Sequence, residues 1–489
     1  MYCLILVLIV ALILSSLLVF KNKISKNYID IGLKVAVIVL FVLGNIRSFL
    51  NDNFIWVING GTYGEIYYEK IDIIQSLLRW GHCLTYVVLP CAVFFKVRTY
   101  KNFAVYFCFF VAVFELIFFN QTMEYFLTDS TRAIYAPAWF RYVEYLLELF
   151  ICLIVPLVIR FVQGHKFDLK NKKEYINFFG LLPLALIIVM PVYLLQSIFG
   201  FTDRKMKPLS MENFVWIIII FVFAAVIYFL FRFKDREKRY SVLVFLSLYL
   251  FIHYNSIYLM DLNASRLPFQ LCNLGAYLVL IALLIKKQSF FNFVLLANVP
   301  GATIAFVAVD VSQGLLSFWN IHFYIEHMWV FIIPILAVAL KIFERPKKNA
   351  FKHFLIGYTI YFLVCAISGV ILNSFFYEEN HLFFNKVNYF YMFDNKVASF
   401  LPFLAFTRNY AIVLSDYAFY PLYMLLVYAL FLMYCLIFNY FYVMFIRIGD
   451  DHFRLRQIRI NMKIKNGYYE KHKRNIPQLD YEKEGEEQC

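Results

Sequence analysis

Long apolar runs, separated by short segments that hold most of the charged residues, make up nearly the whole sequence. A helix needs roughly 20 apolar residues to cross the hydrocarbon core of a bilayer. About thirteen such runs are present, at residues 2–20, 32–50, 78–96, 103–120, 141–162, 175–199, 213–232, 240–260, 266–285, 291–310, 321–342, 351–373 and 420–446. The sequence therefore predicts an all-α polytopic membrane protein with about thirteen transmembrane helices.

The composition excludes several other classes of protein. Of the 489 residues, 62% are hydrophobic and only 16% are charged, whereas a soluble chain carries about a quarter charged residues. The 20% aromatic content, with 17 Gly and 13 Pro, argues against collagen-like and disordered chains. All but the last of the nine cysteines lie in strongly apolar segments, so no disulfide framework is expected.

The basic residues indicate how the chain is oriented in the membrane. Clusters of Lys and Arg follow every odd-numbered run, with one mild exception near residues 204–207. Because basic loops are retained in the cytoplasm, we expect a plasma-membrane protein with its N-terminus outside and its C-terminus in the cytoplasm. No basic residue precedes the first run and three lysines follow it, which favours a retained span over a cleaved signal peptide. Orientation and anionic inner-leaflet lipid account for the net charge of +14 without nucleic acid.

Two pairs of segments indicate an internal repeat. Residues 96–103 resemble residues 286–293 at an offset of 190, and residues 148–156 resemble residues 326–334 at an offset of 178. An even number of spans separates the copies, so the sequence predicts two parallel six-helix repeats plus a final helix. The expected domains are a diverged repeat at 1–204, a second repeat with the last span at 205–446, and a basic then acidic cytoplasmic tail at 447–489.

Ionisable residues inside predicted spans are candidates for function, because a charge in the bilayer is costly. They are Glu115, Glu144, Glu148, His253, Asp310, Glu326 and His327. Hydration near an interface is the simpler interpretation for Glu144, His253 and Asp310.

Cys272 and His327 form the sharper candidate pair. Both lie near the start of spans that run inward, which places each roughly 9–10 Å below the outer boundary. A neighbouring imidazole can deprotonate a thiol and make it a nucleophile. The alternatives are a cysteine that fills apolar space and a histidine that hydrogen-bonds across helices.

Three segments carry a resemblance to a known family. They are Leu267-Pro-Phe-Gln-Leu-Cys272 at the start of a helix, Glu326-His327 two spans later, and Asn388-Tyr389 before the last span, which begins Pro421-Leu-Tyr423. Over about residues 210–446 the chain resembles the YwaF-type bacterial integral membrane proteins, which are distantly similar to eukaryotic multipass acyltransferases that make ether phospholipids. Gln270 stands where that family usually has a histidine.

The resemblance implies a membrane-embedded acyltransferase that acts on phospholipids. Cys272 would accept the acyl group and His327 would be the base. The polar residues expected to contact the substrate are Arg266, Gln270, Asn273, Glu326, Asn388 and Tyr389. In the first half, His82 and Cys83 match the start of this helix, but Leu149 stands at the position of His327, so we expect that half to be structural or lipid-binding.

Other functions stay open at this stage. A transporter or lipid flippase built from parallel repeats is the main alternative, and a noncatalytic membrane scaffold is a third. Phosphate-binding loops of the Walker type, zinc signatures and Gly-x-Ser-x-Gly motifs are absent from the sequence. We therefore expect no metal and no cofactor, and we expect membrane phospholipids rather than nucleic acid as partners.

Overall fold

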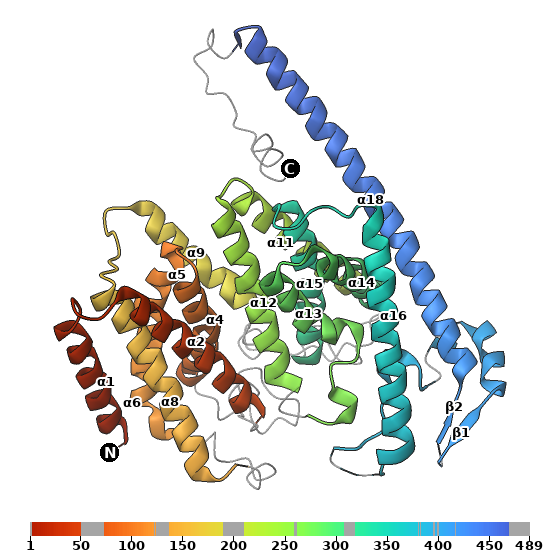
Figure 1. The fold of residues 1–489 in the computed structure, drawn as a ribbon, viewed down its shortest axis with the longest axis horizontal. Coiled ribbons are helices and arrows are strands. Elements are labelled where there is room, and N and C mark those ends of the chain that lie inside the picture. Colours follow the sequence, from red (N-terminus) through yellow and green to blue (C-terminus); the bar gives the residue numbers. More distant parts are fainter. Residues whose placement is uncertain are drawn as a thin grey trace. The chain divides into compact units, whose positions relative to one another are not determined.

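A computed structural model of the protein describes residues 2–49, 73–121, 123, 136–188, 210–258, 262–307, 318–379, 381, 383–394, 397–398, 401–415 and 417–468. Helices predominate in this part of the chain, and its strands form a single hairpin (Figure 1). Asp310, residues 204–207 and the acidic end of the tail lie outside the described residues.

The helices of the first half follow the predicted runs closely. They are α1 (Tyr2–Val19), α2 (Lys26–Phe49), α4 (Ile73–Phe94), α5 (Arg98–Phe103), the π-helical η2 (Ala104–Cys108), α6 (Phe109–Ile117), α8 (Ala138–Leu157), the π-helical η3 (Val158–Val162) and α9 (Lys172–Ile188). The segments α5, η2 and α6 are continuous, as are α8 and η3.

The described residues of the second half form seven long helices, several short helical turns and the hairpin. They are α11 (Met211–Phe231), α12 (Arg236–Tyr258), the 3-10 turn η4 (Ala264–Arg266), α13 (Leu271–Ile285), α14 (Gln288–Val307), α15 (Phe318–Ala339), α16 (Lys348–Ile371), the π-helical η5 (Leu372–Phe376), the 3-10 turns η6 (Tyr389–Tyr391) and η7 (Pro402–Asn409), β1 (Ile412–Leu414), β2 (Tyr417–Phe419) and α18 (Pro421–Lys465). The two strands pair antiparallel, with Val413 opposite Ala418.

Nine helices within the described ranges are long and apolar enough to cross a membrane. They are 2–19, 26–47, 98–117, 138–162, 211–231, 288–307, 322–339, 349–376 and 421–444, and the apolar parts of α4 (81–94) and α13 (271–285) are shorter. Each of the thirteen predicted runs overlaps a helix of the described residues, although α12 is not among the nine and α9 is described only to residue 188. The protein is thus an all-α, multi-pass membrane protein.

The first half packs around α4 and α8. The helix pairs in contact are α2 with α4, α2 with α8, α4 with η2, α6 with α8, α4 with α8, α1 with α8 and α5 with α9. Several of these helices lie side by side at the red and orange end of the chain (Figure 1). Because most of α1 and much of α2 is exposed, their apolar faces are suited to contact lipid.

The second half packs around α13, α14 and α15. The helix pairs in contact are α12 with α13, α12 with α15, α13 with α14, α14 with α15, α13 with α15, α11 with α15 and α14 with α16. The end of α14 lies beside the start of α15, where Phe306 contacts Tyr324, and the start of α14 lies beside Phe343, just after α15. Tyr240 at the start of α12 donates a hydrogen bond to Leu283 O near the end of α13. Neighbouring helices are therefore antiparallel, so α13 and α15 run in the same direction.

The contacts divide the chain into two units, residues 1–428 and residues 429–489. The first unit holds both halves and the hairpin. The second consists of the rest of α18 and the tail.

Candidate functional site

The start of α13 is the place where most of the predicted site residues gather. The sequence predicted a helix from residue 266, but residues 264–266 form η4, the chain then extends past Pro268, and α13 begins only at Leu271. Cys272 is therefore the second residue of the helix, in the first turn, where backbone N–H groups lack helical partners and the helix dipole favours a thiolate. The backbone amides of Cys272 and Asn273 lie within hydrogen-bonding range of the sulfur.

Gln270 joins this helix start to the loop that contains η6. Its Nε2 donates to Asn388 O at 2.8 Å, and its Oε1 accepts from Phe390 N at 3.1 Å. Asn388 Oδ1 in turn accepts from Phe393 N. Both ends of the Gln270 amide are therefore engaged by backbone groups, so Gln270 holds the loop in place.

Tyr389 fixes the same loop from the other side. Its hydroxyl donates to Ala264 O in η4, and its ring lies 4.8 Å from that of Phe269. The Phe269 carbonyl accepts hydrogen bonds from Tyr361 and Cys365 of α16. The structure thus brings Gln270, Asn388 and Tyr389 together, as parts of a support that positions the first turn of α13.

A close helix crossing sets the level of Cys272 relative to α15. A Cβ atom on Gly275 would lie 2.9 Å from Val330 Cγ1 and 3.0 Å from Asn298 Nδ2. Cys272 precedes Gly275 by three residues and His327 precedes Val330 by three, which is a rise of about 4.5 Å on each helix. Because α13 and α15 are parallel and residues three apart share a face, this contact predicts that Cys272 and His327 lie at about the same level.

The two side chains are not hydrogen-bonded to each other. Within the described residues, Cys272 Sγ donates to Asn273 Oδ1 at 3.5 Å, and His327 Nδ1 donates to Phe323 O at 2.6 Å. Donation from Nδ1 to a carbonyl makes Nε2 the nitrogen with the free lone pair in a neutral ring. His327 is therefore held in the tautomer that can accept a proton at Nε2.

Glu326 and two histidines form a buried polar chain beside this pair. Glu326 Oε2 lies 3.4 Å from His322 Nε2, and His322 Nδ1 lies 2.8 Å from His253 Nε2 on α12. Glu326 is close enough to the Cys272 thiol to act on it electrostatically, and Arg266 acts likewise on His322.

Sequence reasoning missed His322 although its spacing of four residues from Glu326 places both on one helix face. His253 and Glu144 are 5% and 2% exposed. Protein packing rather than water surrounds these two side chains, so the expectation of simple hydration was wrong for both.

Asn298 of α14 is a second residue that the sequence did not single out. It is 1% exposed, and neither its Nδ2 nor its Oδ1 has a hydrogen-bond partner among the described residues. An unpaired buried amide is unfavourable and calls for an explanation. The available signal was a lone asparagine in the middle of an apolar run.

The first half holds its own buried polar cluster around His82 of α4. His82 Nδ1 lies 2.7 Å from Glu115 Oε2 and its Nε2 lies 3.2 Å from Glu148 Oε2, while Arg47 Nη1 lies 2.7 Å from Glu148 Oε2. Tyr86 donates to Glu148 Oε1 at 2.9 Å. The side chains of Arg47, His82, Glu115 and Glu148 are each at most 2% exposed.

No group of three or more His, Cys, Asp or Glu side chains in the described part of the chain could hold a metal ion.

Residues 208–437 match the model of the TMEM164 family. This segment begins just before α11, ends within α18 and contains Cys272, His327 and the loop that holds the start of α13. The match supports a TMEM164-like multi-pass membrane protein. No curated protein and no solved structure matches the chain, so its similarity to YwaF-type proteins and to acyltransferases stays a prediction.

Proposed function

We propose that the protein is a membrane-embedded acyltransferase that acts on phospholipids, with Cys272 as the nucleophile and His327 as the base. The observation that carries this proposal is the packing of Gly275 against Val330. It supports a geometry in which the thiol and the imidazole face each other at one level. The tautomer of His327 and the position of Cys272 in the first helical turn add to the support.

The chemistry runs in two balanced steps. His327 Nε2 takes the proton of the Cys272 thiol, and the thiolate attacks the carbonyl carbon of a phospholipid ester. The C–O bond breaks, the lysophospholipid oxygen takes the proton back from His327, and a thioester remains on Cys272. A lysophospholipid hydroxyl then attacks the thioester, which transfers the acyl chain and restores the thiol. Because the thiol and imidazole are not hydrogen-bonded in this structure, the first transfer uses a bridging water or a rotation of the Cys272 side chain.

Asn298 takes the role of polarising the carbonyl in this proposal. Its amide lies at the Gly275 contact, one turn below Cys272, and has a free N–H group. Asn273, beside the sulfur, is the second donor. Glu326, His322 and His253 extend the polar chain away from the thiol, and Arg266 acts electrostatically on His322.

We also propose that the two halves are parallel repeats. The support comes from contacts at the offsets found in the sequence. In the first half Cys152 Sγ donates to Thr85 Oγ1 at 3.6 Å, and the positions that correspond in the second half are Val330 and Gly275. His82 corresponds to Cys272 and Glu148 to Glu326, and both pairs interact.

The membrane orientation is part of the proposal, with the protein in the plasma membrane, the N-terminus outside and the C-terminus in the cytoplasm. Labelling of single cysteines introduced at residues 96–101 tests it. Protection from an impermeant reagent in intact cells is expected, and labelling from outside would refute this orientation.

A transporter or flippase is the second candidate, favoured by the buried cluster around His82. Intramembrane Arg, His and Glu residues in contact often mark ion or proton pathways. Export of labelled lipid or ions from liposomes, without any exchange of acyl chains, would favour this alternative.

Acyl exchange in liposomes tests the main proposal. Purified full-length protein should move isotope-labelled acyl chains between phospholipids, and Cys272→Ala should lose at least about 100-fold of that rate. Cys91→Ala, which removes another buried cysteine, is the matched control and should retain the rate. His327→Gln should slow formation of the thioester, which mass spectrometry of the Cys272 peptide detects. Unchanged exchange in Cys272→Ala would refute the mechanism.

A further inference from the structure

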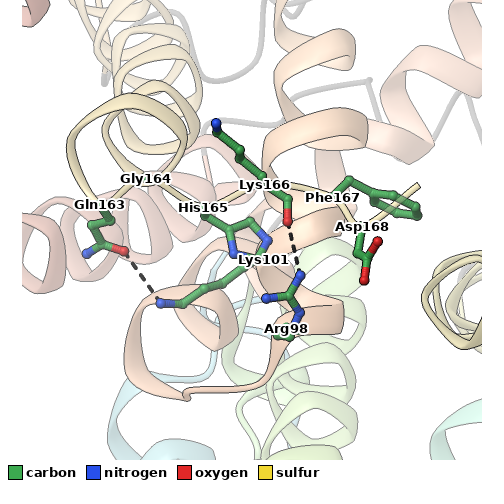
Figure 2. A pocket seen from close by; sticks show the side chains of 8 residues that line it. All are labelled: Arg98, Lys101, Gln163, Gly164, His165, Lys166, Phe167 and Asp168. Carbon is green, nitrogen blue, oxygen red and sulfur yellow. Dashed lines mark hydrogen bonds between the residues drawn. The ribbon is translucent and has the colours of Figure 1, made fainter. Parts of the chain in front are cut away.

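A pocket of about 470 Å³ lies between the start of α5 and the loop that follows η3. Arg98 and Lys101 come from α5, and Gln163, His165, Lys166 and Asp168 come from the loop (Figure 2). Lys101 Nζ donates to Gln163 Oε1 at 3.5 Å, and Arg98 Nη2 donates to Lys166 O at 3.0 Å. These two hydrogen bonds connect the walls of the pocket.

The charge of this pocket is predominantly positive. Three of its side chains are cationic and one, Asp168, is anionic. The nearby Glu174 carboxylate is already engaged, because it accepts hydrogen bonds from Arg98 Nε, Asn102 Nδ2 and Asp168 N. The Lys166 ammonium group donates to none of the described residues. The pocket therefore keeps uncompensated positive charge and free N–H donors.

The positive charge of the pocket also acts on the imidazole of His165. Burial, together with the positive charges of Arg98 and Lys101, lowers the pKa of His165 to about 4. The ring is therefore neutral at pH 7, and its Nε2 donates to Asn102 Oδ1 at 2.7 Å. An anionic ligand, in addition to Asp168, would therefore be attracted into the pocket.

The pocket adjoins the ends of two candidate spans. One span begins at Arg98 and the other ends at Val162, so the pocket lies where both helices leave the apolar region. Phe167 in its wall packs against Tyr106 and Tyr175, and Phe161 beside it is 49% exposed. Aromatic residues of this kind collect at the level of lipid headgroups.

We propose that this pocket binds the phosphate of an anionic glycerophospholipid, with Lys101 and the free Nη1 of Arg98 as donors and Lys166, whose side chain points away from them in Figure 2, as a third cation at the edge of the pocket. Basic pockets beside membrane helices take anionic headgroups in this way. The exposed aromatic rim would cover the start of the acyl chains. The site is separate from the Cys272 region and does not depend on acyltransferase activity.

The test titrates short-chain phosphatidylglycerol onto full-length protein in zwitterionic detergent and counts bound lipid by native mass spectrometry. Short-chain phosphatidylcholine and inorganic phosphate form two further arms. The double variant Lys101→Gln/Lys166→Gln removes two pocket cations. The matched control Lys170→Gln/Lys172→Gln removes two exposed cations from the same region, with an equal change in net charge.

Phosphatidylglycerol should bind more tightly than phosphatidylcholine, and the pocket variant should weaken its binding by about tenfold. The control should change binding by less than about twofold, and thermal unfolding should confirm that both variants are folded. An equal loss of phosphatidylglycerol binding in the two variants would show that the lipid is attracted by the overall positive charge of the region, and it would overturn the proposed site. Displacement of the lipid by inorganic phosphate at similar concentration would show that the ligand is a soluble phosphate compound and would overturn the lipid assignment.

Discussion

Gly275 of α13 lies so close to Val330 of α15 that a Cβ atom at residue 275 would come within 2.9 Å of Val330 Cγ1. A side chain larger than hydrogen fits there only if the Val330 side chain or one of the helices shifts, because packed interiors leave little free space. In the proposed mechanism this contact sets the height of Cys272 relative to His327. The proposed chemistry therefore depends on a glycine that takes no part in it.

Gly275→Ala should separate α13 from α15 near the proposed site. Overpacking of this kind costs about 1–3 kcal/mol, so we expect a lower melting temperature in detergent and at least about tenfold slower acyl exchange. Gly180→Ala, on the exposed face of α9 with open space around the added Cβ, is the control and should leave both quantities unchanged or raise stability slightly. Normal exchange in the Gly275 variant would show that the helix crossing does not set the reaction geometry.

Hydrophobic runs were sufficient to locate the helices, because a span of this length has few alternatives in a bilayer. The start of α13 could not be predicted in the same way. Pro268 is compatible with a first helical turn, but Gln270 instead bonds to backbone groups 118 and 120 residues away. Contacts at that separation leave no periodic signal in the sequence.

The contacts within the buried polar clusters could not be predicted from the sequence either. The sequence located Glu115 and Glu148 within apolar runs, but their contacts with His82 depend on how α4, α6 and α8 pack. Arg47 lay near the end of a predicted run, where a charged residue is ordinarily solvated. Only the packing of α2 against α8 shows that it pairs with Glu148.

Glu148→Ala should strongly destabilise the first half of the protein. The change leaves Arg47 and His82 buried without one of their anionic partners, and breaking a buried ion pair costs about 3–5 kcal/mol. Thermal unfolding in detergent measures the loss. Glu344→Ala is the control, since its partner Lys347 is 78% exposed and an exposed pair is worth less than about 1 kcal/mol. Similar losses in the two variants would mean that the buried cluster contributes no more than a surface pair.

His165 should make stability depend on pH in the acid range. Its pKa is about 4 in the folded protein against an ordinary value of 6.5, so between these values the unfolded chain binds a proton that the folded chain does not. The resulting stability is fully present above pH 6.5 and is lost as the pH falls toward 4. Burial is the largest cause of the lowered pKa; Arg98, Lys101 and Arg160 also repel the protonated ring, and Glu174 opposes them.

The measurement compares melting temperatures of the wild type and His165→Gln from pH 7 to pH 4. Glutamine keeps a donor for Asn102 and does not titrate, so the wild type should lose roughly one to two degrees more than the variant over this range. All other titrating groups are present in both proteins, so their effects cancel in the difference between the two melting temperatures. If the melting temperatures of the two proteins fell in parallel with pH, the titration of His165 would not be the cause of the pH dependence.

The variant Asn298→Leu distinguishes between a structural and a catalytic role of the unpaired Asn298 amide. If the amide only fills space, its replacement by an apolar side chain of similar volume removes a buried unsatisfied group, and stability and acyl exchange should both be unchanged or improved. If it polarises the ester carbonyl, exchange should fall about 10²–10³-fold, as for the loss of one oxyanion donor, while the melting temperature holds or rises. We expect the second result, with normal lipid binding. Ala297→Leu, on the same helix but buried without a polar group, should instead lower stability by overpacking, which distinguishes general damage to α14 from the loss of a single N–H donor.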